Sequence, residues 1–470
     1  MIQHPLRDPG SFRDPSGYVF HDGERVIRAI TESAWIKFEN VYNSGIIQAL
    51  ASQGLAIDCR PIDASPEEIG NFQGARSEKI AAVFEHPRIP FISYPYEWVF
   101  PQLKDAALAH LDLQIAAFER GFVLSDATAY NMQFLNGKPL HIDTMSLRRY
   151  EVGQVWDGYN QFCRQFLLPL LLEAWGGVNF QAFYRGSLDG ISFVDAMAIL
   201  PRRKVFTSPS ALMHVFFHGR AVNKKSTSQE NRPPSQKLGS KSYLAILQQL
   251  RDFIAGLQSK KRPSTYWSNY ANANSYSDRM KDRKLSFVKE WASTYKPETL
   301  LDIGGNTGEY SCAALEAGCL SSVLLDSDAD SVATAYQEHT VQGTPILPLL
   351  INVLDPTPAM GWRQKERSGL ASRARADGVV ALAVIHHLVL GGNLPLDDTV
   401  NWIMERAPNG VIEFVPKQDP MVAGLLSARE DIYTDYSEDR FRQAVSARGR
   451  IVSEQVFEEN GRLLIAFESE

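Results

Sequence analysis

Short apolar runs and helix-like stretches alternate along the second half of the chain. Helical spacing of apolar residues separates most of the runs, which is typical of parallel strands joined by crossover helices. The last two runs follow each other directly. The pattern predicts a seven-stranded wound α/β sheet whose candidate strands are residues 299–303, 322–326, 346–351, 378–384, 411–415, 451–457 and 462–467. Helices at 243–257 and 277–294 are expected before it.

The first half has a different pattern, with shorter alternating segments and fewer repeats. An Asp22-Gly23 pair between residues 17–20 and 25–30 predicts a β-hairpin. Amphipathic stretches and short apolar runs follow it, so an α+β arrangement is expected. The further predicted elements are helices at 33–53 and 102–120 and strands at 81–84 and 91–93.

A polar segment rich in Lys, Ser and Pro, residues 223–242, has almost no apolar positions. Such a composition is typical of an exposed linker. The expected organisation is therefore a domain at 1–222, a flexible linker at 223–242 and a domain at 243–470.

Composition excludes several classes of protein. Apolar residues make up 44% and charged residues 22% of the 470, and the net charge is −6, so neither disorder nor a chain-wide nucleic-acid footprint is expected. The N-terminus lacks an apolar signal segment, and no apolar run reaches the length of a membrane span. We expect a cytoplasmic protein with no nucleic-acid or membrane partner. The four cysteines, Cys59, Cys163, Cys312 and Cys319, form no disulfide or zinc pattern.

The turn after the predicted strand at 299–303 combines a carboxylate with glycines: Asp302, Gly304, Gly305, Asn306 and Gly308. Glycines let a ligand approach the backbone closely. The spacing does not fit the dinucleotide fingerprint, in which a pyrophosphate lies on a helix N-terminus. A carboxylate there suits a cationic cofactor better, and S-adenosylmethionine carries an ammonium, a sulfonium and a ribose diol.

A second carboxylate ends the next predicted strand. Asp326 lies 24 residues beyond Asp302 (326 − 302 = 24), close to the spacing of carboxylates that bind a ribose diol. Together, the segments LDIGGNTGEYS and VLLDSD resemble the cofactor motifs of class I methyltransferases. The resemblance extends from residue 266 to the C-terminus. The resemblance departs at Asn306, where many members have glycine.

The resemblance also implies roles for individual residues. Asp302, Gly304 and Gly308 would line the methionine end of the cofactor, with Gly305 and Asn306 in the same turn. Asp326 would hold the ribose hydroxyls, and the segment from Asn352 to Asp355 would approach the adenine. No metal is expected in this domain.

Candidate acceptor residues follow the fourth and fifth predicted strands, because ligands lie outside the carboxyl ends of strands in open α/β sheets. His386 or His387 would act as a general base toward a hydroxyl or amine, or would only cap a helix or pack. Glu413 and Lys417 would bind the acceptor or pair with each other. An aromatic stretch at 266–276 would cover the cofactor or pack between domains.

Several segments also resemble methyltransferases among rhizobial host-range nodulation proteins. They are residues 346–349 through Gly361-Trp362, the His-His pair and the IEFVPK sequence. The resemblance does not identify an acceptor.

In the first half, Asp126, Asn131 and Asp143 follow the order that phosphotransfer requires. That chemistry uses an Asp that accepts the substrate proton, an Asn five residues later for a metal ion, and a second Asp for magnesium. A hairpin signal, Asn136-Gly137, lies between them. The region at 15–220 resembles the kinase-like fold of aminoglycoside phosphotransferases, which implies ATP and magnesium as cofactors. It departs from that family in having no glycine-rich phosphate loop and no lysine in the strand at 25–29.

The sequence therefore predicts a methyltransferase dependent on S-adenosylmethionine that acts on a small-molecule or carbohydrate-derived acceptor. The N-terminal domain would recruit substrate or regulate. Alternatively, it is itself a phosphotransferase, or its Asp and Asn side chains only cap turns. Neither the acceptor atom nor the oligomeric state follows from the sequence.

Overall fold

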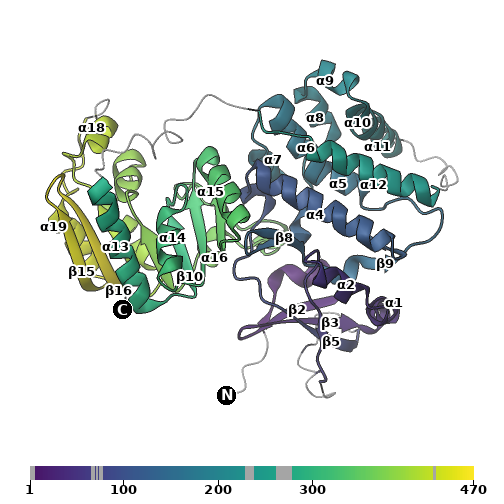
Figure 1. The fold of residues 1–470 in the computed structure, drawn as a ribbon, viewed down its shortest axis with the longest axis horizontal. Coiled ribbons are helices and arrows are strands. Elements are labelled where there is room, and N and C mark those ends of the chain that lie inside the picture. The colour runs from purple at the N-terminus through teal and green to yellow at the C-terminus, as the bar shows by residue number, and fades with distance from the viewer. Residues whose placement is uncertain are drawn as a thin grey trace. The chain divides into compact units, whose positions relative to one another are not determined.

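The computed structural model describes residues 6–64, 69, 72, 78–227, 238–260, 278–426 and 430–469. The chain divides into two compact units (Figure 1). Unit 1 comprises Met1–Arg262 and Ala359–Ser368, and unit 2 comprises Pro263–Pro358 and Gly369–Glu470. None of the helices in the described part of the chain combines the length and apolarity that crossing a bilayer requires.

Unit 2 is built on one seven-stranded sheet in the order β12-β11-β10-β13-β14-β16-β15. The strands from β12 to β14 are parallel, and β16 runs antiparallel to both of its neighbours. The strands are β10 Thr299–Ile303, β11 Ser321–Asp326, β12 Ile346–Leu350, β13 Gly378–Ala381, β14 Asn409–Phe414, β15 Gly449–Phe457 and β16 Arg462–Ser469. The predicted Rossmann-like seven-stranded sheet is confirmed.

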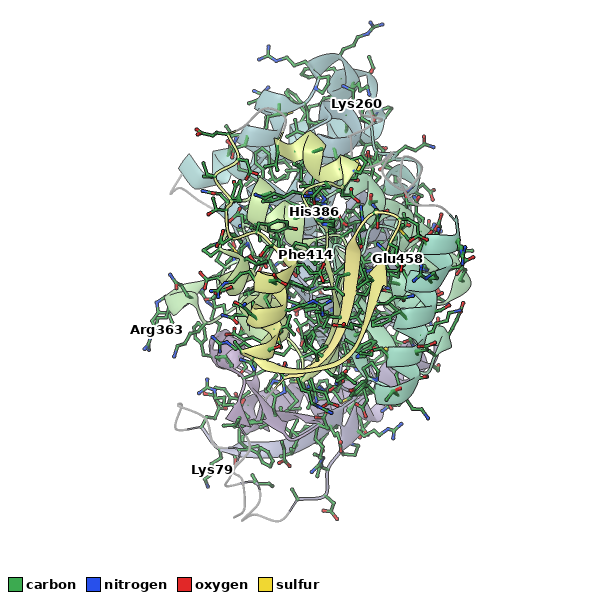
Figure 2. All side chains as sticks on the ribbon, turned by 90° about the vertical axis from the view of Figure 1, so that its left-hand side faces the viewer. Lys79, Lys260, Arg363, His386, Phe414 and Glu458 are labelled. Carbon is green, nitrogen blue, oxygen red and sulfur yellow. The ribbon has the colours of Figure 1, made fainter. Side chains whose placement is uncertain are left out.

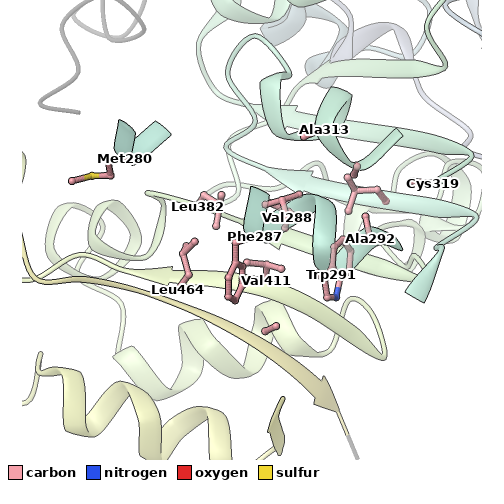
Figure 3. Packing of buried hydrophobic residues seen from close by; sticks show 14 of the residues in the cluster. Met280, Phe287, Val288, Trp291, Ala292, Ala313, Cys319, Leu382, Val411 and Leu464 are labelled. Atoms are coloured by element: carbon pink, nitrogen blue, oxygen red, sulfur yellow. The ribbon is translucent and has the colours of Figure 1, made fainter. Parts of the chain in front are cut away.

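Helices cover both faces of this sheet. Phe287, Val288 and Trp291 of helix α13 pack with Val411 of β14 in one apolar cluster (Figure 3). Successive strand residues point to opposite faces, so Phe414, three positions beyond Val411, faces the other layer. There its ring lies 5.4 Å from that of Phe441 in helix α19. The helices of unit 2 are α13 Asp278–Tyr295, α14 Glu309–Glu316, α15 Ala329–Gln342, α16 Leu370–Arg373, α17 Leu396–Met404, α18 Pro420–Leu426 and α19 Glu438–Ser446.

The strand order fixes where a ligand would lie. From β10 the chain winds outward to β11 and β12, and then returns to the other side of β10 to form β13. The order therefore reverses between β10 and β13. Ligands of open α/β sheets bind outside the carboxyl ends of the strands at such a reversal.

Unit 1 contains an antiparallel five-stranded sheet, two strand pairs and a set of helices. The sheet order is β1-β2-β3-β5-β4, and the pairs are β6-β9 and β7-β8. Its strands are β1 Leu6–Arg7, β2 Gly17–Asp22, β3 Arg25–Thr31, β4 Arg60–Pro61, β5 Ile80–His86, β6 Phe122–Leu124, β7 Met132–Leu135, β8 Lys138–His141 and β9 Leu147–Arg149. Its principal helices are α1 Glu32–Asn43, α2 Ile46–Ser52, α4 Phe100–Phe118, α8 Phe193–Ile199, α9 Arg202–Thr207, the π-helix η7 Leu212–Phe217, α11 His218–Thr227 and α12 Ser240–Ala255.

Three predicted elements differ from the structure. The helix expected at 33–53 is two helices, because Gly45 adopts a left-handed φ of 73° between them. The strand expected at 91–93 is not formed. The strand expected at 378–384 ends at Ala381, and Ala383 has a φ of 53°.

The domain boundary also differs from the expected one, because helix α12 lies in unit 1 and not in unit 2. The hydroxyl of Tyr243 accepts a hydrogen bond of 2.7 Å from Gln114 in α4, and its ring stacks on Phe118 at 4.7 Å. Arg251 forms an ion pair with Asp112 of the same helix. Parts of the expected linker are ordered, because α11 extends to Thr227 and Leu238 pairs with Gly153. Residues 228–237 and the aromatic stretch at 266–276 lie outside the described residues.

Candidate functional site

The turn after β10 has the backbone that its glycines predict. Gly304 and Gly308 have φ angles of 70° and 92°, which favour glycine. Asn306, where the class I methyltransferase pattern often has glycine, has a φ of 49°. Asparagine tolerates this left-handed region better than other residues with a side chain. The departure at position 306 is therefore compatible with the turn.

Close packing explains why side chains are absent at these positions. A Cβ at Gly304 would lie 2.3 Å from Val384, just beyond β13. One at Gly305 would lie 2.8 Å from the Asp302 carboxylate, and one at Gly308 would lie 2.7 Å from His339. The turn is thus in direct contact with the chain that follows β13, on the side where the strand order reverses.

Asp302 lies beneath the turn and is 1% exposed. Its Oδ2 accepts a hydrogen bond of 2.6 Å from Ser311 in α14, and Ser311 is also 2.9 Å from the hydroxyl of Ser322. Burial raises the pKa of Asp302 to about 6, although the hydrogen bond from Ser311 lowers it. The hydrogen bond between this carboxylate and Ser311 joins β10 to α14 on either side of the turn. The expected contact of Asp302 with a cofactor ammonium stays a prediction.

Asp326 is the last residue of β11, and the glycine turn after β10 holds its side chain. Its Oδ2 accepts a hydrogen bond of 2.9 Å from the backbone N–H of Asn306, and its Oδ1 accepts one of 2.8 Å from the backbone N–H of Asp328. The side chain is only partly buried. Each carboxylate oxygen has a second lone pair, so the group retains capacity for the hydroxyls of a ribose diol.

Asn352 and Asp355 follow β12 and are exposed. The backbone N–H of Ile351 donates to the carbonyl of Asp326, which ties the ends of β12 and β11 together. The two residues expected near the adenine therefore lie at the same edge of the sheet as Asp326.

The two adjacent histidines differ from the expected general base. His386, which is labelled in Figure 2, is 0% exposed. Within the described residues neither of its ring nitrogens has a hydrogen-bond partner. Its ring centroid is 3.9 Å from that of His387. Burial, followed by the positive charge of Arg462, lowers the pKa of His387 to about 4, and burial lowers that of His386 as well. Both rings are therefore neutral near pH 7 and are weak bases, suited to hydrogen bonding or packing.

Glu413 is not available to bind an acceptor. It is 0% exposed, and its Oε1 accepts hydrogen bonds from Lys284 at 2.5 Å and from Arg462 at 3.3 Å. Its Oε2 accepts one of 2.9 Å from the backbone N–H of Ala383. Arg462 also bonds Asp419 at 2.7 Å. Glu413 instead holds the chain segment that leads from β13 to the two histidines.

The expected alternative, a pair between Glu413 and Lys417, is also wrong. The ammonium of Lys417 donates to both carboxylate oxygens of Asp431 at 2.8 Å and to the carbonyl of Tyr433 at 2.6 Å. Lys417 lies three residues beyond the last residue of β14.

Sequence patterns did not predict the side chains that hold the carboxylates of Asp302 and Glu413. Lys284 lies on the amphipathic helix α13, and Arg462 opens β16 directly after the Asn460-Gly461 turn, so both looked like ordinary surface charges. Ser311 was equally unremarkable in sequence. Only the packing of α13 and β16 on β14 brings the two cations to one carboxylate.

In unit 1 the structure brings Asp126, Asn131 and Asp143 together. The side-chain amide of Asn131 donates to Asp126 at 3.2 Å and to Asp143 at 3.4 Å. The predicted hairpin between them is β7-β8, with Asn136 and Gly137 at its turn. Each carboxylate also caps a local turn, Asp126 by accepting from the N–H of Thr128 and Asp143 by accepting from that of Met145.

The electrostatics of this cluster are those of two partly buried like charges. Burial raises the pKa of Asp126, and the charge of Asp143 raises it further. Burial also raises the pKa of Asp143, whereas Arg28 of β3 lowers it. Arg28 forms an ion pair with Asp14. Within the described residues, no group of three or more His, Cys, Asp or Glu side chains has the geometry to hold a metal ion.

Comparisons with known proteins give one full-length relative and several partial structural likenesses. The chain is 38% identical over 467 residues to nodulation protein NoeA of Rhizobium meliloti (strain 1021), covering 99% of this chain and 96% of the relative. No protein-family model matches the chain.

Among solved structures, the N-methyltransferase NodS from Bradyrhizobium japonicum WM9 in complex with S-adenosyl-l-homocysteine is 12% identical, covers 43% of this chain and 96% of its own, and has a TM-score of 0.31. Magnesium protoporphyrin IX methyltransferase (ChlM) from Synechocystis PCC 6803 with bound SAM is 14% identical, covers 45% of this chain and 87% of its own, and has a TM-score of 0.29. Structural similarity at this level carries no conclusion about activity.

Proposed function

The chain belongs to the family of nodulation protein NoeA, and within that family we propose that it acts as a methyltransferase that uses S-adenosylmethionine. The acceptor would be a small molecule or a carbohydrate-derived molecule. The observation that carries the proposal is the joining of two features at one sheet edge, because the backbone of the glycine turn after β10 bonds the Asp326 carboxylate at the end of β11. A ribose carboxylate such as Asp326 occurs in dinucleotide folds as well, but the glycine spacing and the Asp302 carboxylate beneath the turn suit a cationic cofactor better than a pyrophosphate.

The residues present fit such a cofactor in charge and hydrogen-bonding capacity. Asp326 offers lone pairs to a ribose diol, Asn352 and Asp355 lie at the same edge, and Asp302 supplies negative charge beneath the turn. The cofactor would supply an electrophilic methyl group. The protein's part would be mainly alignment, because displacement at a sulfonium depends on holding two reacting atoms in line.

Isothermal titration calorimetry of the full chain with S-adenosylmethionine tests the cofactor directly. Asp326→Ala should weaken binding by at least about 100-fold, because it removes a carboxylate from both the turn and the diol. The matched control is Asp330→Asn, an exposed carboxylate in the first turn of α15, which should bind like the wild type. No heat of binding at about millimolar ligand, or equal loss in both variants, would contradict the proposal.

A second candidate function is phosphotransfer in unit 1, with ATP and magnesium. It is favoured by the single amide of Asn131, which donates hydrogen bonds to both Asp126 and Asp143. Asp126 would accept the substrate proton, and Asn131 and Asp143 would hold the metal ion.

Magnesium-dependent ATP turnover by the full chain would support this candidate if Asp143→Asn abolished it. A third possibility is that unit 1 only recruits the acceptor. In that case removal of all three side chains should raise the KM for the acceptor and leave methyl transfer to excess acceptor intact.

A further inference from the structure

One face of unit 1 combines exposed aromatic side chains with cations. It is formed by helix α9, the π-helix η7 and helix α11, and we call it the aromatic-basic face. Phe206 is 48% exposed and Phe217 is 58% exposed. Its exposed aromatic and basic residues, among those the structure describes, are Arg202, Arg203, Lys204, Phe206, Phe217 and Arg220.

These side chains form one surface. The ring of Phe206 lies 5.0 Å from that of Phe216, which lies 5.4 Å from Phe217. The guanidinium of Arg220 lies 5.4 Å from the centre of the Phe216 ring. Arg202 and Arg203 lie one helical turn before Phe206 on α9, so they flank the same ring. The surface thus has an apolar centre with a cationic rim.

Its charge is opposite to that of the whole chain. Residues 191–223 contain four Lys or Arg and one Asp, a net charge of 4 − 1 = +3, whereas the chain has −6. None of the four cations forms an ion pair within the described residues. An acidic protein would be repelled from an anionic surface except through a face of this kind.

We propose that the aromatic-basic face docks the protein on an anionic lipid bilayer. Phenylalanine rings partition into the boundary between headgroups and acyl chains, and arginine and lysine beside them bind anionic headgroups. A single-stranded nucleic acid would use the same cations and stack its bases on exposed rings, but the rings of this face meet edge to face, at interplanar angles of 66° and 67°, and form no common stacking plane. The sequence prediction of no membrane partner depended on the absence of long apolar segments, and surface docking does not need one.

Co-sedimentation of the full chain with vesicles tests the proposal. Binding is expected to vesicles of phosphatidylcholine with phosphatidylglycerol, and not to phosphatidylcholine alone. It should be lost when salt is raised from about 0.1 M to about 0.5 M, because screening shortens the reach of the cations. Replacing Arg202, Arg203, Lys204 and Arg220 by Gln should weaken binding on the order of 100-fold. The double variant Phe206→Ser with Phe217→Ser should weaken it roughly tenfold.

The matched control is Leu320→Ser with Val341→Ser in unit 2, two side chains that are 65% and 89% exposed. It should bind vesicles like the wild type. All variants replace exposed side chains, and unchanged thermal melting confirms that they fold. The proposal is overturned if the wild type does not bind anionic vesicles, or if both double variants weaken binding equally. It is also overturned if a single-stranded oligonucleotide binds the face and vesicles do not, or if Phe206→Ser with Phe217→Ser converts a dimer into a monomer. These outcomes are independent of S-adenosylmethionine binding.

Discussion

At the ends of β10 and β11 the carboxylates of Asp302 and Asp326 are held by neutral donors, whereas at the end of β14 that of Glu413 is held by two cations. Hydroxyl and backbone N–H groups stabilise a carboxylate without cancelling its charge, so the first edge remains negative. Lys284 and Arg462 neutralise Glu413, and Arg462 is balanced in turn by Asp419.

The difference separates two tasks at one sheet edge. A negative edge attracts a cation, which suits the proposed cofactor, whereas a neutralised network fixes backbone geometry. Glu413 bonds the N–H of Ala383, a residue in the left-handed region, and so holds the segment that carries His386 and His387. The segment that carries the two histidines is therefore held by charges that are themselves buried.

The largest effect that would test this comparison is on stability. Glu413→Gln would leave Lys284 and Arg462, which are 1% and 0% exposed, without their shared counter-ion. Removing one partner of a buried ion pair typically costs about 3–5 kcal/mol. We expect a loss of that order in the free energy of unfolding of unit 2, measured by urea denaturation. Asp431→Asn, which breaks the exposed pair with Lys417, should change it far less. If Glu413→Gln were as stable as the wild type, the network would not be structural.

A second prediction concerns the pH dependence of cofactor affinity. Burial raises the pKa of Asp302 from 3.8 to about 6, so this carboxyl is protonated below that value and charged above it. Affinity for the cationic cofactor should rise as pH increases through about 6, and should fall by up to about tenfold for each pH unit below it. Calorimetry across this range with the wild type and with Asp302→Asn measures the effect. A wild-type profile identical to that of Asp302→Asn would exclude the contribution of Asp302.

The carboxyl of Asp302 also affects folding stability, and this effect has a pH dependence opposite to that of cofactor affinity. Because its pKa is raised in the folded state, the folded protein retains a proton that the unfolded chain has released between about pH 4 and pH 6. Stability from this group therefore falls as pH rises through that window. The free-energy cost of burying the charged carboxylate offsets part of the stability that the hydrogen bond from Ser311 contributes.

The smallest effect is expected at the histidines. With a pKa of about 4 for His387, both imidazoles should stay neutral from about pH 5 to pH 8. Nuclear magnetic resonance of protein labelled with 15N-histidine would show no titration of these two rings in that range. Titration of either ring near pH 6.5 would restore the general base that its position after β13 suggested.

Local patterns predicted the sheet and the backbone of the glycine turn well. Seven apolar runs gave seven strands, and the glycine turn has the left-handed φ angles that its residues require. The Asp126, Asn131 and Asp143 cluster was likewise predicted by spacing, because a short hairpin brings its ends together. These features depend on residues close in the chain.

Contacts between distant residues were decided only by the tertiary structure. Lys284 and Glu413 are 129 positions apart, and Gln114 and Tyr243 are equally far apart, so no local pattern joins them. Strand periods, turn chemistry and the carboxylates at strand ends can all be predicted from the sequence, because they follow from backbone conformation over a few residues. Packing decided which charges became buried and which unit gained helix α12, because burial depends on elements that meet only after the chain has folded.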